Sequence, residues 1–167
     1  DLSEFLGMLS LFNKPVFEFD EKYMNINEEG TSTKSKYYFA DESILTTPQK
    51  DVKMPETEVE FTLTQTDLTN IKKAASMLQL PDIAVKSVGS DIIMSAVDKK
   101  NDTANTYDVK VGETNKNFEF HFKTEHFKML PGDYTVAISS KLISNFKNKN
   151  KSVQYWIALE NTSKYEG

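Results

Sequence analysis

The sequence predicts an α+β fold built from repeated units, each with one helix followed by three strands. The order helix, strand, strand, strand occurs three times, starting near residues 1, 66 and 124. The helical segments repeat apolar residues at spacings of three and four, whereas the strand segments alternate apolar and polar residues. A further strand precedes the helix in the last two units. We therefore expect antiparallel sheets with the helices on one face.

Composition limits the class of protein. The chain has 167 residues, 38% hydrophobic and 27% charged, which suits one ordinary globular domain or two small ones. No apolar run is long enough to span a membrane, and the apolar start "FLGMLSLF" lacks the basic region of a signal peptide. There is no cysteine, which excludes disulfides and thiolate metal sites and fits a reducing, intracellular setting.

The net charge of −5 speaks at first against nucleic-acid binding, although a basic stripe on an acidic protein can still hold DNA. All 20 basic residues are Lys, for which codon usage in an AT-rich genome is one explanation. Lys is a compact point charge, whereas Arg forks onto guanine edges. Any DNA contact is therefore predicted to involve phosphate and not base sequence.

The first unit begins with a helix at residues 1–12, which ends before Pro15. One face of this helix carries Leu2, Phe5, Leu6 and Leu9. Strands are predicted at residues 16–20, 22–27 and 33–39. Residues 41–57 contain two prolines and mixed charge without a period, which predicts an extended connector.

The second unit starts with an alternating strand at 58–63 and continues with the clearest helix, at 66–79. Thr66 or Asp67 is expected to cap that helix. Its apolar stripe consists of Leu68, Ile71, Ala75 and Leu78. Three strands follow, at 83–88, 91–97 and 104–112.

The third unit has a strand at 117–122 and a short helix at 124–130, capped by Thr124 and ended by Pro131 and Gly132. Phe127, Met129 and Leu130 of this helix are expected in the core. The strands that follow are placed at 134–139, 142–147 and 152–160. Units two and three form a natural pair, while unit one lacks a partner, so we expect the chain to begin in the middle of a domain.

The polar face of helix 66–79 is a candidate surface for DNA. It carries Thr69, Asn70, Lys73 and Ser76, with Lys72 on the flank, and no acid after Asp67. Helix 124–130 adds Lys123 and Lys128 beside Glu125. Lysines with small polar groups attract phosphate without reading bases. An ordinary solvated helix face is the alternative.

The connector is a candidate site for a protein partner, because apolar residues on a loop often mark a binding surface. The candidates are Leu45, Val52, Met54 and Pro55, next to Ile44. Packing of these side chains back on a sheet is the alternative.

The residues give little support for catalysis or metal binding. His121, Glu125 and His126 are close in sequence, but a strand and a helix separate the two histidines and a third fixed ligand is missing. No glycine-rich phosphate loop, nucleophile elbow or Ser/His/Asp arrangement stands out. We expect no enzyme activity, no cofactor and no metal.

Four segments in order carry a family resemblance: "DLSEFLGMLSLFN", "TDLTNIKKAASMLQLPDIAV", "FKMLPGDYTV" and "YWIALE". Together they resemble the DNA sliding clamps, and among them the processivity factors of T-even-type bacteriophages, over essentially the whole chain. Relative to that family, the first strand–helix–three-strand unit and the strand into the second helix are absent. The resemblance implies the DNA-clamp fold. It also implies a truncated N-terminal clamp domain at 1–43, an interdomain connector at 44–56 and a complete C-terminal clamp domain at 57–167.

The family is known as a ring of three subunits around duplex DNA, with helices lining the hole and sheets forming the outer wall. It has no catalytic site, is opened by a clamp loader, and tethers the replicative polymerase through a peptide docked in an apolar pocket. The resemblance thus implies a DNA-replication accessory protein in the cytoplasm of the infected bacterial host. This truncated chain is expected to self-associate as a trimer, to pair its first units as a dimer, or to stay monomeric.

Two other functions are kept as alternatives. A viral structural or assembly protein could share the β-rich build without any DNA role, and its apolar contacts would resist salt that weakens phosphate contacts. A small hydrolase using His121 or His126 has no supporting arrangement of residues.

Overall fold

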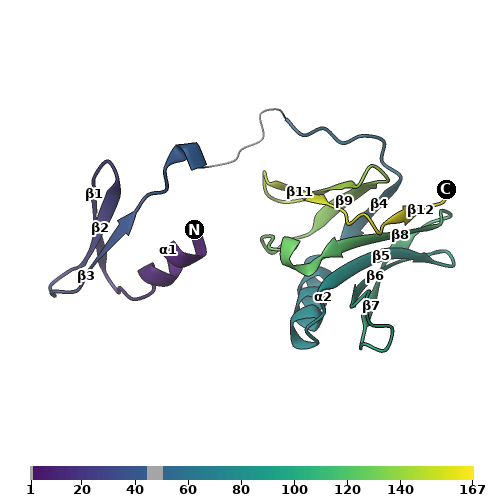
Figure 1. The fold of residues 1–167 in the computed structure, drawn as a ribbon, viewed down its shortest axis with the longest axis horizontal. Coiled ribbons are helices and arrows are strands. Elements are labelled where there is room, and N and C mark those ends of the chain that lie inside the picture. Colours follow the sequence, from purple (N-terminus) through teal and green to yellow (C-terminus); the bar gives the residue numbers. More distant parts are fainter. Residues whose placement is uncertain (1, 45–50) are drawn as a thin grey trace. The chain divides into compact units, whose positions relative to one another are not determined.

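The computed structural model describes residues 2–44 and 51–167, and the chain divides into two compact units, residues 1–50 and 51–167 (Figure 1). This division falls inside the segment predicted as a connector. Among the described residues, no helix combines the length and the apolar character that crossing a membrane requires.

The first unit has one helix and a three-stranded antiparallel sheet. Its elements are α1 (Leu2–Leu9), β1 (Pro15–Phe19), β2 (Tyr23–Glu28), β3 (Lys34–Tyr38) and the 3₁₀ turn η1 (Glu42–Ile44), with strand order β1-β2-β3. Met24 and Ile26 on the central strand are buried, and the ring of Phe5 in α1 lies 5.2 Å from that of Tyr37 in β3. The helix and sheet predicted for this unit are therefore present.

The core of the first unit is thin. Leu2 and Leu6, on the apolar face of the predicted helix, are 71% and 54% exposed. Phe17 and Phe19 on β1 stack on each other with ring centroids 6.2 Å apart and are also exposed. A helix buries its apolar stripe only where a second layer covers it, and one three-stranded sheet covers only part of α1.

The second unit consists of one long helix and two antiparallel sheets (Figure 1). In chain order its elements are β4 (Val59–Leu63), α2 (Gln65–Met77), β5 (Asp82–Val88), β6 (Asp91–Val97), β7 (Tyr107–Glu113), β8 (Phe118–Lys123), η2 (Thr124–His126), β9 (Tyr134–Ser139), β10 (Ile143–Asn148), β11 (Gln154–Ala158) and β12 (Lys164–Tyr165). One sheet has the order β12-β8-β5-β6-β7 and the other β11-β10-β9-β4.

The two repeats of this unit exchange their leading strands. β4 pairs with β9 of the other repeat, and β8 pairs in the same antiparallel manner with β5. The resulting orders, β4-β9-β10-β11 and β8-β5-β6-β7, are equivalent when the repeats are interchanged. This equivalence is what the predicted pairing of units two and three requires. The short strand β12, which the sequence pattern did not predict, adds to β8.

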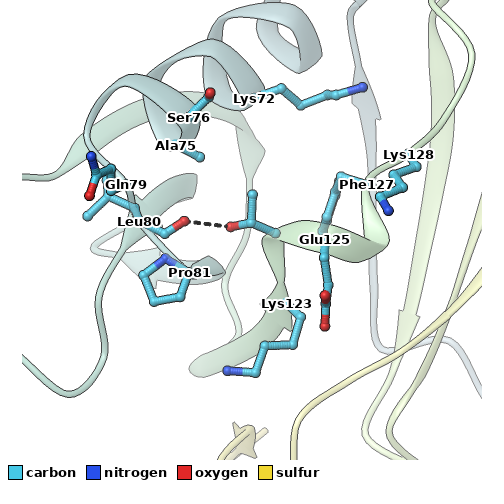
Figure 2. A pocket seen from close by; sticks show the side chains of 11 residues that line it. Lys72, Ala75, Ser76, Gln79, Leu80, Pro81, Lys123, Glu125, Phe127 and Lys128 are labelled. Atoms are coloured by element: carbon cyan, nitrogen blue, oxygen red, sulfur yellow. Dashed lines mark hydrogen bonds between the residues drawn. The ribbon is translucent and has the colours of Figure 1, made fainter. Parts of the chain in front are cut away.

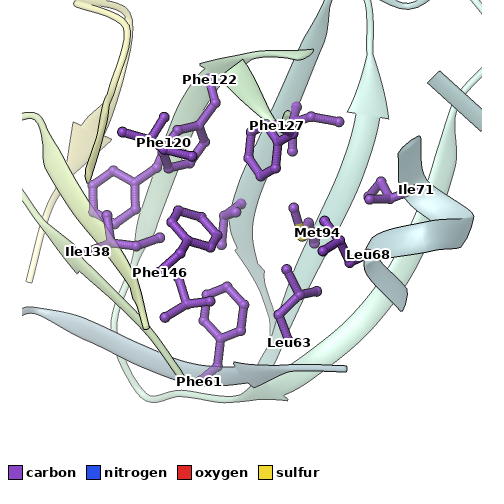
Figure 3. Close-up of a cluster of buried hydrophobic side chains, with 14 of the residues drawn as sticks. Phe61, Leu63, Leu68, Ile71, Met94, Phe120, Phe122, Phe127, Ile138 and Phe146 are labelled. Carbon is purple, nitrogen blue, oxygen red and sulfur yellow. The ribbon is translucent and has the colours of Figure 1, made fainter. Parts of the chain in front are cut away.

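The core of the second unit lies between α2 and the inner faces of the two sheets (Figure 3). The helix contributes Leu68 and Ile71, both essentially inaccessible to solvent. Phe122, Phe127 and Phe146 meet edge to face, with ring centroids 5.6 to 6.3 Å apart. Such aromatic contacts join the two sheets and the segment after β8 into one core.

A glycine allows a close approach between β7 and β4. A Cβ atom on Gly112 would lie 3.3 Å from Cβ of Phe61 and 3.3 Å from Cδ1 of Ile92. The register between β6 and β7 shifts at Ile92 and Ile93 next to this contact. Because a larger residue would push these side chains aside, glycine is the residue that fits here.

The helix predicted at 124–130 is wrong. The helical part is a single 3₁₀ turn at Thr124–His126. The residues after it alternate between buried and exposed side chains, with Phe127 and Met129 buried and Leu130 48% exposed. That alternation is the period of extended chain, so the two buried side chains reach the core from an extended segment. Thr124 does not cap a helix; its hydroxyl donates to the carbonyl of Leu80 at 3.0 Å.

Helix α2 is close to its predicted position but begins and ends earlier. Thr64 is its N-cap, in place of Thr66 or Asp67. The Thr64 hydroxyl accepts the amide of Asp67 at 3.1 Å and donates to its carboxylate at 2.6 Å. Leu78 caps the other end and is 39% exposed, so it is not part of the buried stripe.

Candidate nucleic-acid interface

Helix α2 turns a polar face away from its buried stripe. Leu68, Ile71 and Ala75 are buried, and the residues on the opposite side are exposed. These exposed residues are Thr69, Asn70, Lys73 and Ser76. No acidic residue follows Asp67 until Asp82, so the solvent face of the helix is positive over most of its length.

A groove of about 560 Å³ separates α2 from the segment after β8 (Figure 2). Four of the predicted DNA-facing residues line it: Lys72, Ser76, Lys123 and Lys128. Phe127 and Leu80 form part of its apolar wall, and the Thr124–Leu80 hydrogen bond joins its two sides. The fold thus brings together side chains from two repeats that are about 50 residues apart in sequence.

Lys72 and Lys128 supply charge from opposite sides of this groove (Figure 2). Among the described residues, neither ammonium group is paired with a carboxylate. Lys128 is exposed and Lys72 is half-buried. Glu125 is the acidic residue that lines the same groove. Two unpaired ammonium groups can attract an anion that is presented to both sides.

Lys123 also lines the groove, but its ammonium group is paired with Asp82, which does not line the groove. Its ammonium lies 2.7 Å from the carboxylate of Asp82, which is 1% exposed. The hydrogen bond to Asp82 raises the pKa of Lys123, and burial only partly opposes it. Lys99 approaches the same carboxylate at 3.8 Å and Glu160 at 3.2 Å. The sequence could not reveal this cluster, because its members come from four distant segments.

Asn70 and Lys73 border a different hollow, on another side of α2. This second hollow of about 430 Å³ is lined by Asn70, Lys73, Ala74, Met77, Leu78 and Tyr107. The predicted set therefore divides around the helix, and Thr69 lies exposed on the same helix without lining either hollow.

The described part of the connector is mostly exposed. Val52 is 38% exposed, Pro55 is exposed and Met54 is half-buried, whereas Leu45 lies outside the described residues. The connector leads into Glu58, whose carboxylate accepts hydrogen bonds from Ser140 N at 2.8 Å and Ser140 Oγ at 2.6 Å. Burial acts to raise the pKa of Glu58, but these hydrogen bonds outweigh it and hold the pKa below its ordinary value. The start of β4 is thereby fixed to the second repeat.

The two histidines have different surroundings. His121 is 8% exposed, with Nε2 3.2 Å from a carboxylate oxygen of Glu119 and Nδ1 3.1 Å from the hydroxyl of Thr162. His126 is exposed in η2. In the described ranges, no three His, Asp or Glu side chains gather closely enough to hold a metal ion.

Comparisons with known proteins agree on one family. Residues 60–161 match the family model described as gp45 sliding clamp, C terminal. Over 168 residues the chain is 35% identical to a sliding clamp of Vibrio phage KVP40, covering 96% of this chain and 74% of that protein. It is 26% identical over 178 residues to a sliding clamp of Enterobacteria phage T4, covering 99% and 75%.

Solved clamps share the fold. The PCNA2–PCNA3 complex of Sulfolobus tokodaii gives a TM-score of 0.59 at 16% identity, covering 96% of this chain and 71% of that one. The beta clamp of H. pylori gives 0.60 at 13% identity, covering 95% and 46%. At these identities the likeness establishes the arrangement of helices and strands.

Proposed function

Because this chain belongs to the gp45 family of sliding clamps, we propose that it encircles duplex DNA within a ring and holds the replicative polymerase on its template. As a sliding clamp it is a non-enzymatic protein of phage DNA replication, whose partners are DNA, polymerase and further clamp subunits. We further propose that the ring has three subunits, that a clamp loader opens it, and that it acts in the host cytoplasm.

The domain limits expected from the sequence are also part of this proposal. Residues 1–43 then belong to an N-terminal clamp domain, 44–56 to the connector and 57–167 to a C-terminal clamp domain. The exchange of β4 and β8 between the repeats supports the last of these, since it closes one core over the whole second unit.

We assign the DNA-facing surface to α2 and the segment after β8. The observation that carries this assignment is the acid-free polar face of α2, opposite its buried stripe. A clamp that slides needs attraction to phosphate without contacts to base edges, since base contacts would hold it at one sequence. Lys72, Lys73 and Lys128 supply the charge, and Thr69, Asn70 and Ser76 supply polar groups that do not discriminate between bases. Lys123 contributes to the groove wall while its ammonium neutralises Asp82.

Salt dependence of duplex binding tests this surface. In the triple variant Lys72→Gln, Lys73→Gln, Lys128→Gln, fluorescence anisotropy with a labelled duplex should show a weaker salt dependence. The slope of log K against log [salt] should fall by about 0.9 for each phosphate that the protein no longer neutralises. The extension length of polymerase products on primed template should fall with it.

A charge-matched control keeps the interpretation specific. The triple variant Lys22→Gln, Lys100→Gln, Lys164→Gln removes three exposed lysines that belong neither to α2 nor to the segment after β8, and it should retain the slope. If the two triple variants behave alike, the assignment of α2 to DNA is refuted.

We propose that the connector, with Leu45, Val52, Met54 and Pro55, takes part in holding the partner peptide. The exposure of Val52 and Pro55 supports this. The variant Val52→Asp should weaken polymerase binding in a pull-down, because a carboxylate cannot enter an apolar pocket without a desolvation cost. The same variant should bind duplex DNA as the wild type does, and loss of both activities would contradict a role confined to the partner.

The alternative of a viral assembly protein is not favoured, because the relatives are sliding clamps.

A further inference from the structure

The hairpin between β10 and β11 is the most basic part of the chain. Residues 134–159 contain four lysines and no acid, in a protein with 25 acidic residues and a net charge of −5. Three of these lysines, Lys147, Lys149 and Lys151, alternate with asparagines at the hairpin. The first repeat shows no such segment, so the pattern is a property of this hairpin and not of the fold.

The three ammonium groups are available to a ligand. Lys147, Lys149 and Lys151 are all exposed, and none of them pairs with a carboxylate among the described residues. A hollow of about 200 Å³ lies beside the hairpin, lined by Lys147, Lys151, Ser152, Val153 and Gln154. Charge, hydroxyl and amide groups thus surround a space that suits a small anionic group such as a phosphate.

The hairpin is held in one conformation by Asn148. The Asn148 side-chain oxygen accepts the amides of Asn150 at 3.0 Å and Lys151 at 2.9 Å. The Asn148 side-chain nitrogen lies against Gly132, where an added Cβ would come within 2.5 Å of it. Asn148 is itself 5% exposed, so the turn is built on a buried residue. A fixed turn loses little conformational entropy when it binds.

The tip of the hairpin lies next to the start of α2. The amide of Lys149 donates to the carbonyl of Asp133 at 2.9 Å, and a carboxylate oxygen of Asp133 accepts the amide of Gln65 at 2.7 Å. Gln65 is the first residue of α2. Lys72 lies seven residues further along the helix, about 10 Å away at 1.5 Å per residue. The hairpin therefore extends the basic surface of α2 beyond its N-terminal end.

The position of the hairpin favours DNA over an acidic protein partner. The connector enters β4 at Val59, whereas Leu63 at the other end of β4 pairs with Tyr134, the strand residue directly after Asp133. The hairpin and the connector thus lie toward opposite ends of this strand. The charges are also lysine ammonium groups, which lack the forked donors of Arg. Such groups attract phosphates without fixing them in one position, as a protein that slides along DNA requires.

We propose that the hairpin of Lys147, Lys149 and Lys151 is a second phosphate-contact site, which touches the same duplex as α2. This inference rests on the proposed function. The helix contacts the duplex within the ring, and the hairpin contacts its backbone further along, beyond the start of α2.

The test compares two triple variants of the hairpin with the wild-type chain by salt-dependent anisotropy with a labelled linear duplex. Lys147→Gln, Lys149→Gln, Lys151→Gln together should lower the slope of log K against log [salt] by about 0.9 or more. The corresponding three Lys→Arg changes should preserve the slope, because charge is retained. Thermal unfolding within the wild-type range establishes that each variant folds.

The outcomes separate this inference from the proposed function. The triple variant Lys72→Gln, Lys73→Gln, Lys128→Gln serves as the reference. If it lowers the slope and the hairpin Gln variant does not, the hairpin proposal is overturned while the assignment of α2 stands. If the hairpin Gln variant keeps the slope but loses polymerase in a pull-down, the hairpin binds an acidic protein surface and the proposal is again overturned. If the hairpin variant alone lowers the slope, the hairpin is supported and the assignment of α2 fails.

Discussion

A substitution of Lys123 tests whether this lysine stabilises the fold, in contrast to the lysines that we propose to face DNA. Replacing it by Met keeps most of the side-chain volume and removes the ammonium 2.7 Å from Asp82. Asp82 is 1% exposed, so solvent cannot replace the missing ammonium. We expect Lys123→Met to destabilise the second unit and to leave duplex binding nearly unchanged.

The magnitude follows from the geometry of the cluster. At an effective dielectric constant of about 20, Coulomb attraction to Asp82 is roughly 6 kcal/mol from Lys123 at 2.7 Å and roughly 4 kcal/mol from Lys99 at 3.8 Å, before desolvation. Removing one partner of a buried pair typically costs about 3–5 kcal/mol. Lys99 remains, and the Lys123 side chain is 30% exposed, so a loss of about 2 kcal/mol is expected.

Urea unfolding followed by circular dichroism measures this loss at neutral pH. Because partnership with Asp82 raises the pKa of Lys123, its stabilisation is complete below the ordinary lysine pKa of 10.5 and disappears as pH rises through the raised folded value. The gap between wild type and variant should therefore close in strong alkali. Lys128→Met, an exposed residue of the same groove, is the control and should change stability by less than about 0.5 kcal/mol. Unchanged stability together with weaker duplex binding in Lys123→Met would refute the reasoning.

Three further changes test the packing and the anchor of β4. Glu58→Gln should lose about 1 kcal/mol in urea at pH 7, because the carboxylate accepts two hydrogen bonds from Ser140. Since the folded pKa of Glu58 is lowered, this difference should shrink as pH falls below about 4.5 in acid titrations of stability; a constant difference would argue against the charged form. Gly112→Val should cost about 1–3 kcal/mol by crowding Phe61, and a neutral effect in the same assay would contradict the close approach. Ile71→Ala should cost about 2–5 kcal/mol by thermal or urea unfolding, and an exposed-site value below about 0.5 kcal/mol would place the residue outside the core.

The sequence predicts elements well where one local pattern determines both shape and burial. β4 alternates buried and exposed residues throughout, as expected for residues 58–63, and α2 buries Leu68, Ile71 and Ala75 at helical spacing. In both cases the apolar period matches the geometry of the element. The same logic failed at 124–130, because the apolar residues there fit both periods and the core is reached by an extended segment.

The candidate site was predictable only as a set of residue types. The lysines of α2 could be placed on its polar face from helical geometry alone, and the structure finds Lys73 exposed. That Lys123 faces Asp82 depends on β5 and β8 pairing side by side, which no local pattern indicates. The Asp133 link between the hairpin and α2 is likewise a long-range contact. Such contacts depend on which strands pair in the sheets, and that pairing is determined by the whole chain and not by any local sequence pattern.

Because β4 and β8 are exchanged between the repeats, neither repeat of the second unit can complete its sheet until both repeats have been synthesised. β4 leaves the ribosome well before its partner, since Val59 pairs with Ile138 about 80 residues later. Until β9 is made, β4 has an unpaired edge and α2 covers an incomplete core, so folding must wait for most of the chain. A break in the loop between β7 and β8 would leave each fragment without a strand that the other holds. Neither fragment should fold alone, and the two should refold when mixed, each templating the other.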